Sequence, residues 1–253
     1  MAAETPLLDP GMLSRLIGRA LSRGGSFAEV FVQRKRGLSL ELDDGEIRSS
    51  SSGFVHGVGV RVIRGAQVAY AHSDDLEEEA LLACADAAGR IGPGLDDGEV
   101  TVARPLSRRA RPRHCDPKSP PAEADIRTRL RLLERAYTAA RTEHSGLEKV
   151  LGAWADTDEE ILIANSEGLL VQDRRCLCRL GLRVVAIDEG GRRRVGVHGA
   201  GSRVGLSHYD DALSPEEVAR EAVRMALAQL GAKPAPTGEQ TVVVGPGSSG
   251  VLL

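Results

Sequence analysis

Aromatic side chains and long apolar runs are both scarce in this sequence. Phe, Trp and Tyr make up 3% of its 253 residues, so a hydrophobic core has to be aliphatic, and the 42% hydrophobic content is enough to build one. No apolar run is long enough to cross a bilayer, and residues 1–6 show no basic region leading into an apolar one, as a secretion signal requires. We therefore expect a soluble, cytoplasmic protein with no membrane partner.

An excess of charge of either sign is missing too. Thirty-three basic residues against 36 acidic ones give a net charge of −3, which provides no global field to attract nucleic acid. An arginine cluster lies between Arg104 and Arg113, but no aromatic residue is interleaved with it and its prolines preclude a continuous helix. We expect a solvated linker there and no nucleic-acid partner.

Metal-ligand spacing is also absent. The four cysteines form no CxxC pair, and the six histidines include no pair at i,i+4 on an expected helix. Cys176 and Cys178 alternate on one face of an expected strand, where they are either two metal ligands or, as we favour, small buried hydrophobic residues. The sequence shows no preformed zinc site.

Helical and strand periodicities follow one another in the first half of the chain. An amphipathic helix is expected to begin at Asp9-Pro10 and to end at Gly24-Gly25. Period two over residues 27–73, with turn signals at Asp44-Gly45 and Arg64-Gly65, predicts an antiparallel meander with one solvated face.

A second helix completes this unit, and the second half repeats its order. The second helix is expected to start from a capping box at Asp74 and Glu77, and a short strand to follow at 99–103. The repeat is a helix near 122–144, strands over 150–203 with turns at 165–168 and 190–191, a helix capped at Ser214 that ends at Gly231, and a strand at 241–244.

The pattern predicts an α+β fold of antiparallel meanders flanked by amphipathic helices, with a helix-meander-helix-strand internal repeat. We divide the chain into a first unit (1–103), an Arg/Pro-rich linker (104–121), a second unit (122–239) and a strand with a glycine loop (240–253). That loop satisfies G-x-G-x-x-G, but the antiparallel context and the lack of a following helix argue against dinucleotide binding.

The candidate substrate-binding residues are Gly57, Val58, Gly59 and Arg61. Glycines at alternate positions remove the side chains that would obstruct a peptide adding main-chain hydrogen bonds to an open strand. Arg61 then either meets a substrate carboxylate or is simply solvated. The structural alternative is a bulged or twisted strand whose glycines relieve packing.

Several segments resemble, in the same order, the TldD/PmbA family of metalloproteases. They are 28–32, 57–61 with 69–71, Asn165-Ser-Glu-Gly168 and 245–253. The last resembles the start of the metal-binding helix on the TldD side, where the family continues directly into a His-Glu-x-x-x-His motif. The chain has no residue 254, so no family metal ligand can be carried onto it. We therefore expect the N-terminal part of such a protein, cut inside an element.

The resemblance implies a zinc-dependent metallopeptidase that cleaves unfolded or modified peptides in a heterodimer with a PmbA-like subunit. It implies zinc in the full-length protein, held by two histidines on the helix after Leu253 and by a more distant third ligand, where zinc lowers the pKa of its bound water. On this interpretation the present chain binds no zinc and is inactive alone. The alternative is a non-catalytic module that binds a peptide or a partner, the class to which the label of gyrase modulator belongs.

Overall fold

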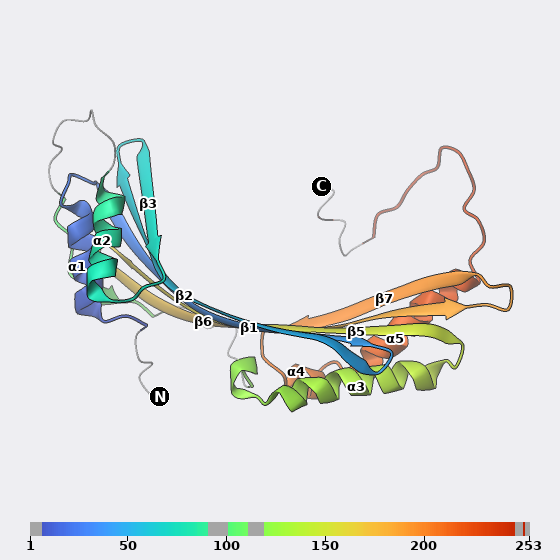
Figure 1. The fold of residues 1–253 in the computed structure, drawn as a ribbon. Helices are drawn as coiled ribbons and strands as arrows, with labels where there is room; N and C mark the ends of the chain where they lie inside the picture. The colour runs from blue at the N-terminus through green and yellow to red at the C-terminus, as the bar shows by residue number, and fades with distance from the viewer. Residues whose placement is uncertain (1–6, 91–100, 111–118, 246–249, 251–253) are drawn as a thin grey trace.

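A computed structural model of the chain describes residues 7–90, 101–110, 119–245 and 250 (Figure 1). The strands are β1 (Phe27–Asp43), β2 (Glu46–Arg64), β3 (Gln67–Ser73), β4 (Ser107–Arg108), β5 (Leu147–Asn165), β6 (Leu169–Ile187) and β7 (Arg193–Ser202). The helices are α1 (Pro10–Leu21), α2 (Glu78–Gly89), α3 (Ile126–Glu143), α4 (His208–Asp211) and α5 (Pro215–Leu230), with a 3-10 turn at Pro121–Glu123. The expected α+β class is confirmed.

The strands form one seven-stranded sheet in the order β3-β2-β1-β5-β6-β4, with β7 also paired to β6. Every pair is antiparallel except β4 with β6. The expected turns join the hairpins, and Gly45, Gly168 and Gly191 adopt the positive φ angles that such turns need. Because β1 pairs with β5 over most of its length, a single sheet runs through both repeats.

Helix starts follow the local sequence closely in two cases. The Asp9 carboxylate accepts a hydrogen bond from the backbone N–H of Met12 at 3.0 Å, and Pro10 occupies the first turn of α1. Ser214 and Glu217 form the expected capping box of α5. The expected capping box of α2 is wrong, because the Ser73 hydroxyl bonds Asp75 in a turn and the helix starts later, after Glu77.

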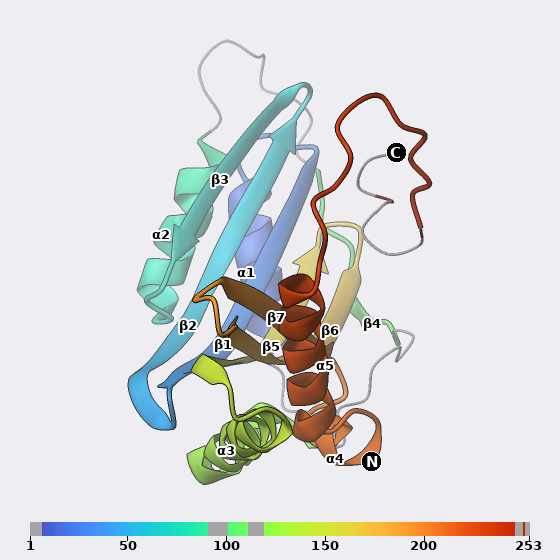
Figure 2. The same ribbon diagram turned by 90° about the vertical axis from the view of Figure 1, so that its right-hand side faces the viewer.

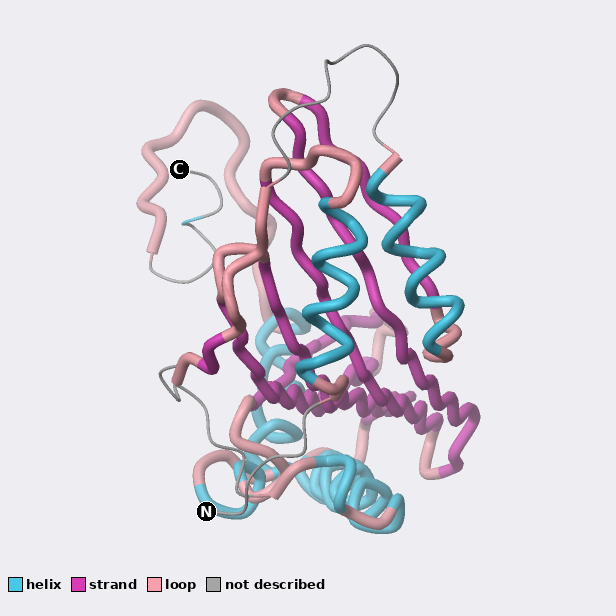
Figure 3. The backbone as a smooth tube through the Cα atoms, turned by 90° about the vertical axis from the view of Figure 1, so that its left-hand side faces the viewer, coloured by secondary structure: helices cyan, strands magenta, loops and turns pink. Residues whose placement is uncertain are grey.

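Two helix pairs cover the same face of the sheet. Helices α1 and α2 pack on the half nearest β3, and α3 and α5 pack on the half nearest β7 (Figures 2 and 3). The buried residues of β1 under both pairs, such as Val30 and Leu40, have even numbers, so they share one side of the strand. The sheet bends between the pairs with all helices on its outer side (Figure 1). No helix in the described ranges is both long and apolar enough to span a membrane.

Two expected strands are wrong where the structure describes them. Residues 101–103 form no strand; instead Ser107–Arg108 within the expected linker pairs with the start of β6, whose edge offers free backbone groups there. Residues 241–244 form no strand either, and Val243 is 90% exposed, because β-branched side chains alone supply no hydrogen-bonding neighbour. Most of the expected glycine loop lies outside the described residues.

Candidate functional site

The face of the sheet that no described helix covers lies on the inner side of the bend (Figure 1). We call it the inner face; β1 contributes to it through its odd-numbered residues, because the even-numbered ones are turned to the helices. The register places one row of residues across five adjacent strands of this face, at the level of Phe31: His72, Gly59, Phe31, Ile163 and Val171. This inner row is apolar and aromatic.

The structure brings three of the four predicted site residues to the inner face. Gly57, Gly59 and Arg61 alternate along β2 on that side, whereas Val58 is 1% exposed and lies in the core beneath α1 and α2. A contact between the Val58 side chain and a peptide on the inner face is therefore excluded by this packing. The strand's period of two separates Val58 from its neighbours.

The backbone edge proposed for peptide binding is only partly open. Val58 and Gly59 pair with β1 on one side and with Ser73 and His72 of β3 on the other. Their main-chain groups therefore belong to the sheet, which contradicts an open strand at these two residues. Beyond Gly57, toward Glu46, β3 no longer accompanies β2, and the second edge of β2 is unpaired within the described chain.

Gly59 lies directly beneath the ring of Tyr70. A Cβ atom at that position would overlap the Tyr70 ring, which lies over it from β3. Tyr70 is 62% exposed and stacks on His72, with ring centroids 6.0 Å apart. The sequence analysis named neither Tyr70 nor His72 as a site residue, because the place of this ring over Gly59 follows from the pairing of β3 with β2.

Arg61 already has a carboxylate partner. Its Nη2 lies 3.1 Å from Oε1 of Glu29 on β1, and both side chains are partly exposed. A substrate carboxylate would compete with Glu29 for this guanidinium. An exposed pair of this kind contributes at most about 1 kcal/mol, so such an exchange costs little.

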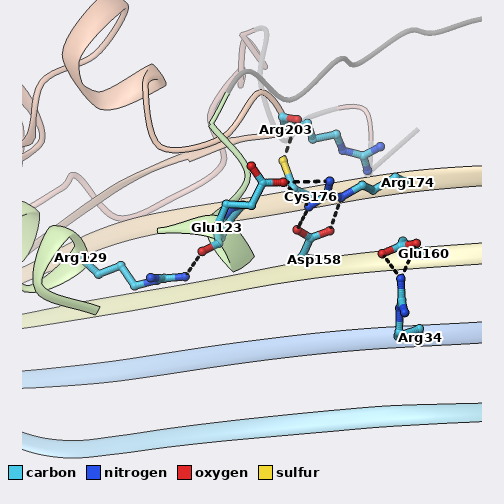
Figure 4. Close-up of polar contacts among 9 residues, drawn as sticks. Arg34, Glu123, Arg129, Asp158, Glu160, Arg174, Cys176 and Arg203 are labelled. Atoms are coloured by element: carbon cyan, nitrogen blue, oxygen red, sulfur yellow. Dashed lines mark hydrogen bonds and ion pairs between the residues drawn. The ribbon is translucent and has the colours of Figure 1, made fainter. Parts of the chain in front are cut away.

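The outer face carries a charged seam between the two helix pairs (Figure 4). Arg34 binds Glu160 at 2.8 Å, and Arg174 binds Asp158 at 2.7 Å. The hydrogen bond to Asp158 raises the pKa of Arg174 above its usual value. The seam surrounds a cavity of about 210 Å³ in which acidic and basic groups balance, so we assign it a structural role.

Two groups beside the seam, the half-buried His56 and the buried Cys178, have shifted pKa values. Burial, with a smaller contribution from Arg34, lowers the pKa of His56, whose Nε2 has no partner in the described chain. Burial raises the pKa of the Cys178 thiol to about 12. Cys176 is also buried, and its Sγ donates to the carbonyl of Arg203, which confirms the expectation that these cysteines are buried.

The described residues do not fit a zinc site. They include no group of three or more His, Cys, Asp or Glu side chains close enough together to hold a metal ion. Zinc sites in proteins use about three or four such ligands. No catalytic step can therefore be built from a metal on these residues.

Known proteins align with about nine-tenths of this chain. Residues 28–92 match a family model described as PmbA/TldA metallopeptidase domain 1, and residues 119–230 match the PmbA/TldA metallopeptidase central domain. A metalloprotease TldD homolog from Haemophilus influenzae is 32% identical over 240 residues, which are 91% of this chain and 48% of that protein. A metalloprotease from Methanothermobacter thermautotrophicus is 25% identical over 231 residues, which are 90% of this chain and 48% of that protein.

Solved structures share the fold at lower identity. A protein described as a putative modulator of a DNA gyrase from Thermotoga maritima superposes with a TM-score of 0.71 at 18% identity, over 90% of this chain and 50% of that one. TldE from Thermococcus kodakarensis superposes with a TM-score of 0.67 at 21% identity, over 85% of this chain and 47% of that one. The chain thus spans about half the length of the relatives it matches.

Proposed function

The chain belongs to the PmbA/TldA metallopeptidase family, and we propose that it is the peptide-handling N-terminal part of a TldD-like, zinc-dependent peptidase that works in the cytoplasm. The observation that carries this proposal is the match to two successive domains of the family, in chain order, together with TldD homologues that align over about nine-tenths of the chain. The substrates proposed are unfolded or modified peptides.

In this proposal zinc is held by residues other than those that the structure describes. Since the described side chains form no metal cluster, the chain's own contribution is a rigid surface. The inner face supports that role: Tyr70 and the half-buried Phe31 offer apolar contacts, and the unpaired edge of β2 at its Gly57 end offers main-chain hydrogen bonds. An extended peptide can use both.

A PmbA-like subunit is the proposed partner. Phe54 and Val55 are 58% and 54% exposed on the same unpaired stretch of β2. A long edge with exposed apolar side chains is usually covered in the working assembly. Copurification of the full-length protein with a PmbA-like protein as one complex supports this assignment, whereas a stable full-length monomer that cleaves peptides alone contradicts it.

Cleavage of an unfolded peptide by the full-length protein, with its partner present, tests the proposed activity. We expect turnover that a chelator abolishes and that added zinc restores. Replacing Tyr70 with Ala should raise KM severalfold, since it removes an exposed aromatic contact. Val68→Ala is the matched control, because Val68 lies on the same strand and is also 62% exposed, two residues from Tyr70.

The second candidate is a non-catalytic binding module. Its support is the description of the solved Thermotoga maritima relative as a putative gyrase modulator, a likeness that extends only to the fold. If the full-length pair binds unfolded peptide on the inner face without cleaving it in the presence of zinc, this candidate replaces the peptidase.

A further inference from the structure

A depression of about 560 Å³ lies in the inner face, where β1, β5, β6 and β7 run side by side near the end remote from Tyr70. Its floor is a cross-strand row of very small residues: Ala153 on β5 and Gly181 on β6, continued by Gly199 on β7. No side chain longer than a methyl group rises from these positions. The backbone of a ligand can therefore approach the sheet closely at Ala153 and Gly181, whereas Arg179 Nε reaches over Gly199, 3.8 Å from the place of a Cβ atom there.

Two arginines stand on either side of this floor. Arg179 and Arg183 flank Gly181 on β6 and are lined up on the inner face, because they are four residues apart on one strand. Both are exposed, and within the described chain neither guanidinium forms an ion pair. Arg175, the next arginine on that face of β6, differs because Asp173 holds it at 2.8 Å.

The acidic groups at the rim leave this charge uncompensated. Asp43 is bound by Lys149 at 3.1 Å and by Arg48 at 2.5 Å, and these contacts lower its pKa. Glu41 accepts a hydrogen bond from the Ser49 hydroxyl. Four basic groups (Arg48, Lys149, Arg179 and Arg183) against two acidic ones (Glu41 and Asp43) leave two positive charges in excess.

We propose that this arginine trough, made of Arg179, Arg183 and the floor between them, binds an extended acidic peptide segment. Arginine binds carboxylates through two parallel hydrogen bonds. In an extended peptide, side chains at i and i+4 point the same way and are about 13 Å apart, which equals the spacing of residues four apart on β6. The side chain at i+2 then faces Gly181, where space is free. This inference rests on the proposed handling of peptides and adds a preference for Glu-x-small-x-Glu segments.

Binding of short labelled peptides to the purified chain, measured by fluorescence anisotropy at low salt, tests this inference. The probe is Glu-Ser-Ala-Ser-Glu with blocked ends; one control has Gln at both Glu positions, and another inserts a Ser so that the carboxylates fall on opposite faces. We expect the probe to bind about five- to twentyfold tighter than either control, as two exposed ion pairs allow. Equal binding of the three peptides would overturn the proposal.

Variants locate the binding. The double variant Arg179→Gln/Arg183→Gln should lose the preference, and Arg179→Lys/Arg183→Lys should keep part of it, because lysine retains charge without the planar fork. The matched control is Arg192→Gln/Arg224→Gln, which removes the same charge from exposed arginines that Asp188 and Glu221 already hold. If Arg192→Gln/Arg224→Gln loses as much affinity for the probe as Arg179→Gln/Arg183→Gln, the probe does not bind in the arginine trough. Displacement of the probe by inorganic phosphate at constant ionic strength also contradicts the proposal. The readout involves no hydrolysis, so its failure is distinct from a failure of the proposed peptidase.

Discussion

Removing the Asp156 carboxylate should destabilise the fold more than any exposed ion-pair change. Asp156 lies on β5 with a side chain only 5% exposed, and its Oδ2 accepts from Arg129 Nε at 2.5 Å and from Trp154 Nε1 at 2.6 Å. Arg129 also donates to the carbonyl of Ala124 at 2.9 Å, so it fixes the start of α3 against the sheet. In Asp156→Ala the buried guanidinium loses its counter-charge, which costs about 3–5 kcal/mol.

Urea denaturation measures this loss. The chain has one tryptophan, so the fluorescence of Trp154 reports on the network itself, and far-ultraviolet circular dichroism reports independently on the helices. Glu160→Gln is the matched control on the same strand: its partner Arg34 is 40% exposed, and the expected cost is below about 1 kcal/mol. The double variant Arg129→Met/Asp156→Leu should recover most of the stability, because no charge is left buried. If Asp156→Ala costs no more than Glu160→Gln, the network does not hold α3 on the sheet.

Three further predictions concern packing and titration. Gly196→Ala should lower the free energy of unfolding by about 1–3 kcal/mol, because its Cβ would overlap the carbonyl oxygen of Ala222 on α5. Gly181→Ala is the control, since its Cβ meets only the carbonyl oxygen of His198 at 3.8 Å. Similar urea midpoints for the two variants would refute this prediction. The lowered pKa of His56 means that the unfolded chain binds a proton more readily, so stability falls as pH drops through about 6.5, and His56→Gln should reduce that fall; an identical pH dependence of the midpoint in both chains contradicts it. Cys178, with a pKa of about 12, should react with a thiol reagent at neutral pH only on unfolding, and rapid labelling of native Cys178 by mass spectrometry would contradict this.

Signals that act over a few residues predicted the fold well. The Asp9 cap, the Ser214 capping box and the glycine turns depend on neighbours within four residues, so the sequence carries them directly. The start of α2 was missed because Ser73 can cap a helix or close a turn, and only the packing of the chain decides between them. The pairing of β4 with β6 was missed because it joins residues far apart in the sequence.

The candidate site was predicted less well, since it depends on register. Alternation along β2 separates Gly57 and Gly59 from Val58, but only the observed pairing with β3 shows that Val58 and Gly59 have no free edge. Residues on other strands decide that the Tyr70 ring lies over Gly59 and that Arg179 and Arg183 are exposed, so the local sequence does not reveal either feature. Replacing Gly59 with valine would consequently displace Tyr70, so Tyr70→Ala is the cleaner probe of the inner face.

We propose that this chain handles peptide while the metal is held elsewhere in the full-length protein. Zinc content by atomic absorption, with cleavage of an unfolded peptide measured on the same samples, tests it most directly. We expect no stoichiometric zinc and no cleavage for the 253-residue chain, and about one zinc with chelator-sensitive cleavage for the full-length protein with its partner. About one zinc per molecule in the 253-residue chain, with chelator-sensitive cleavage, would show instead that this chain holds the metal itself.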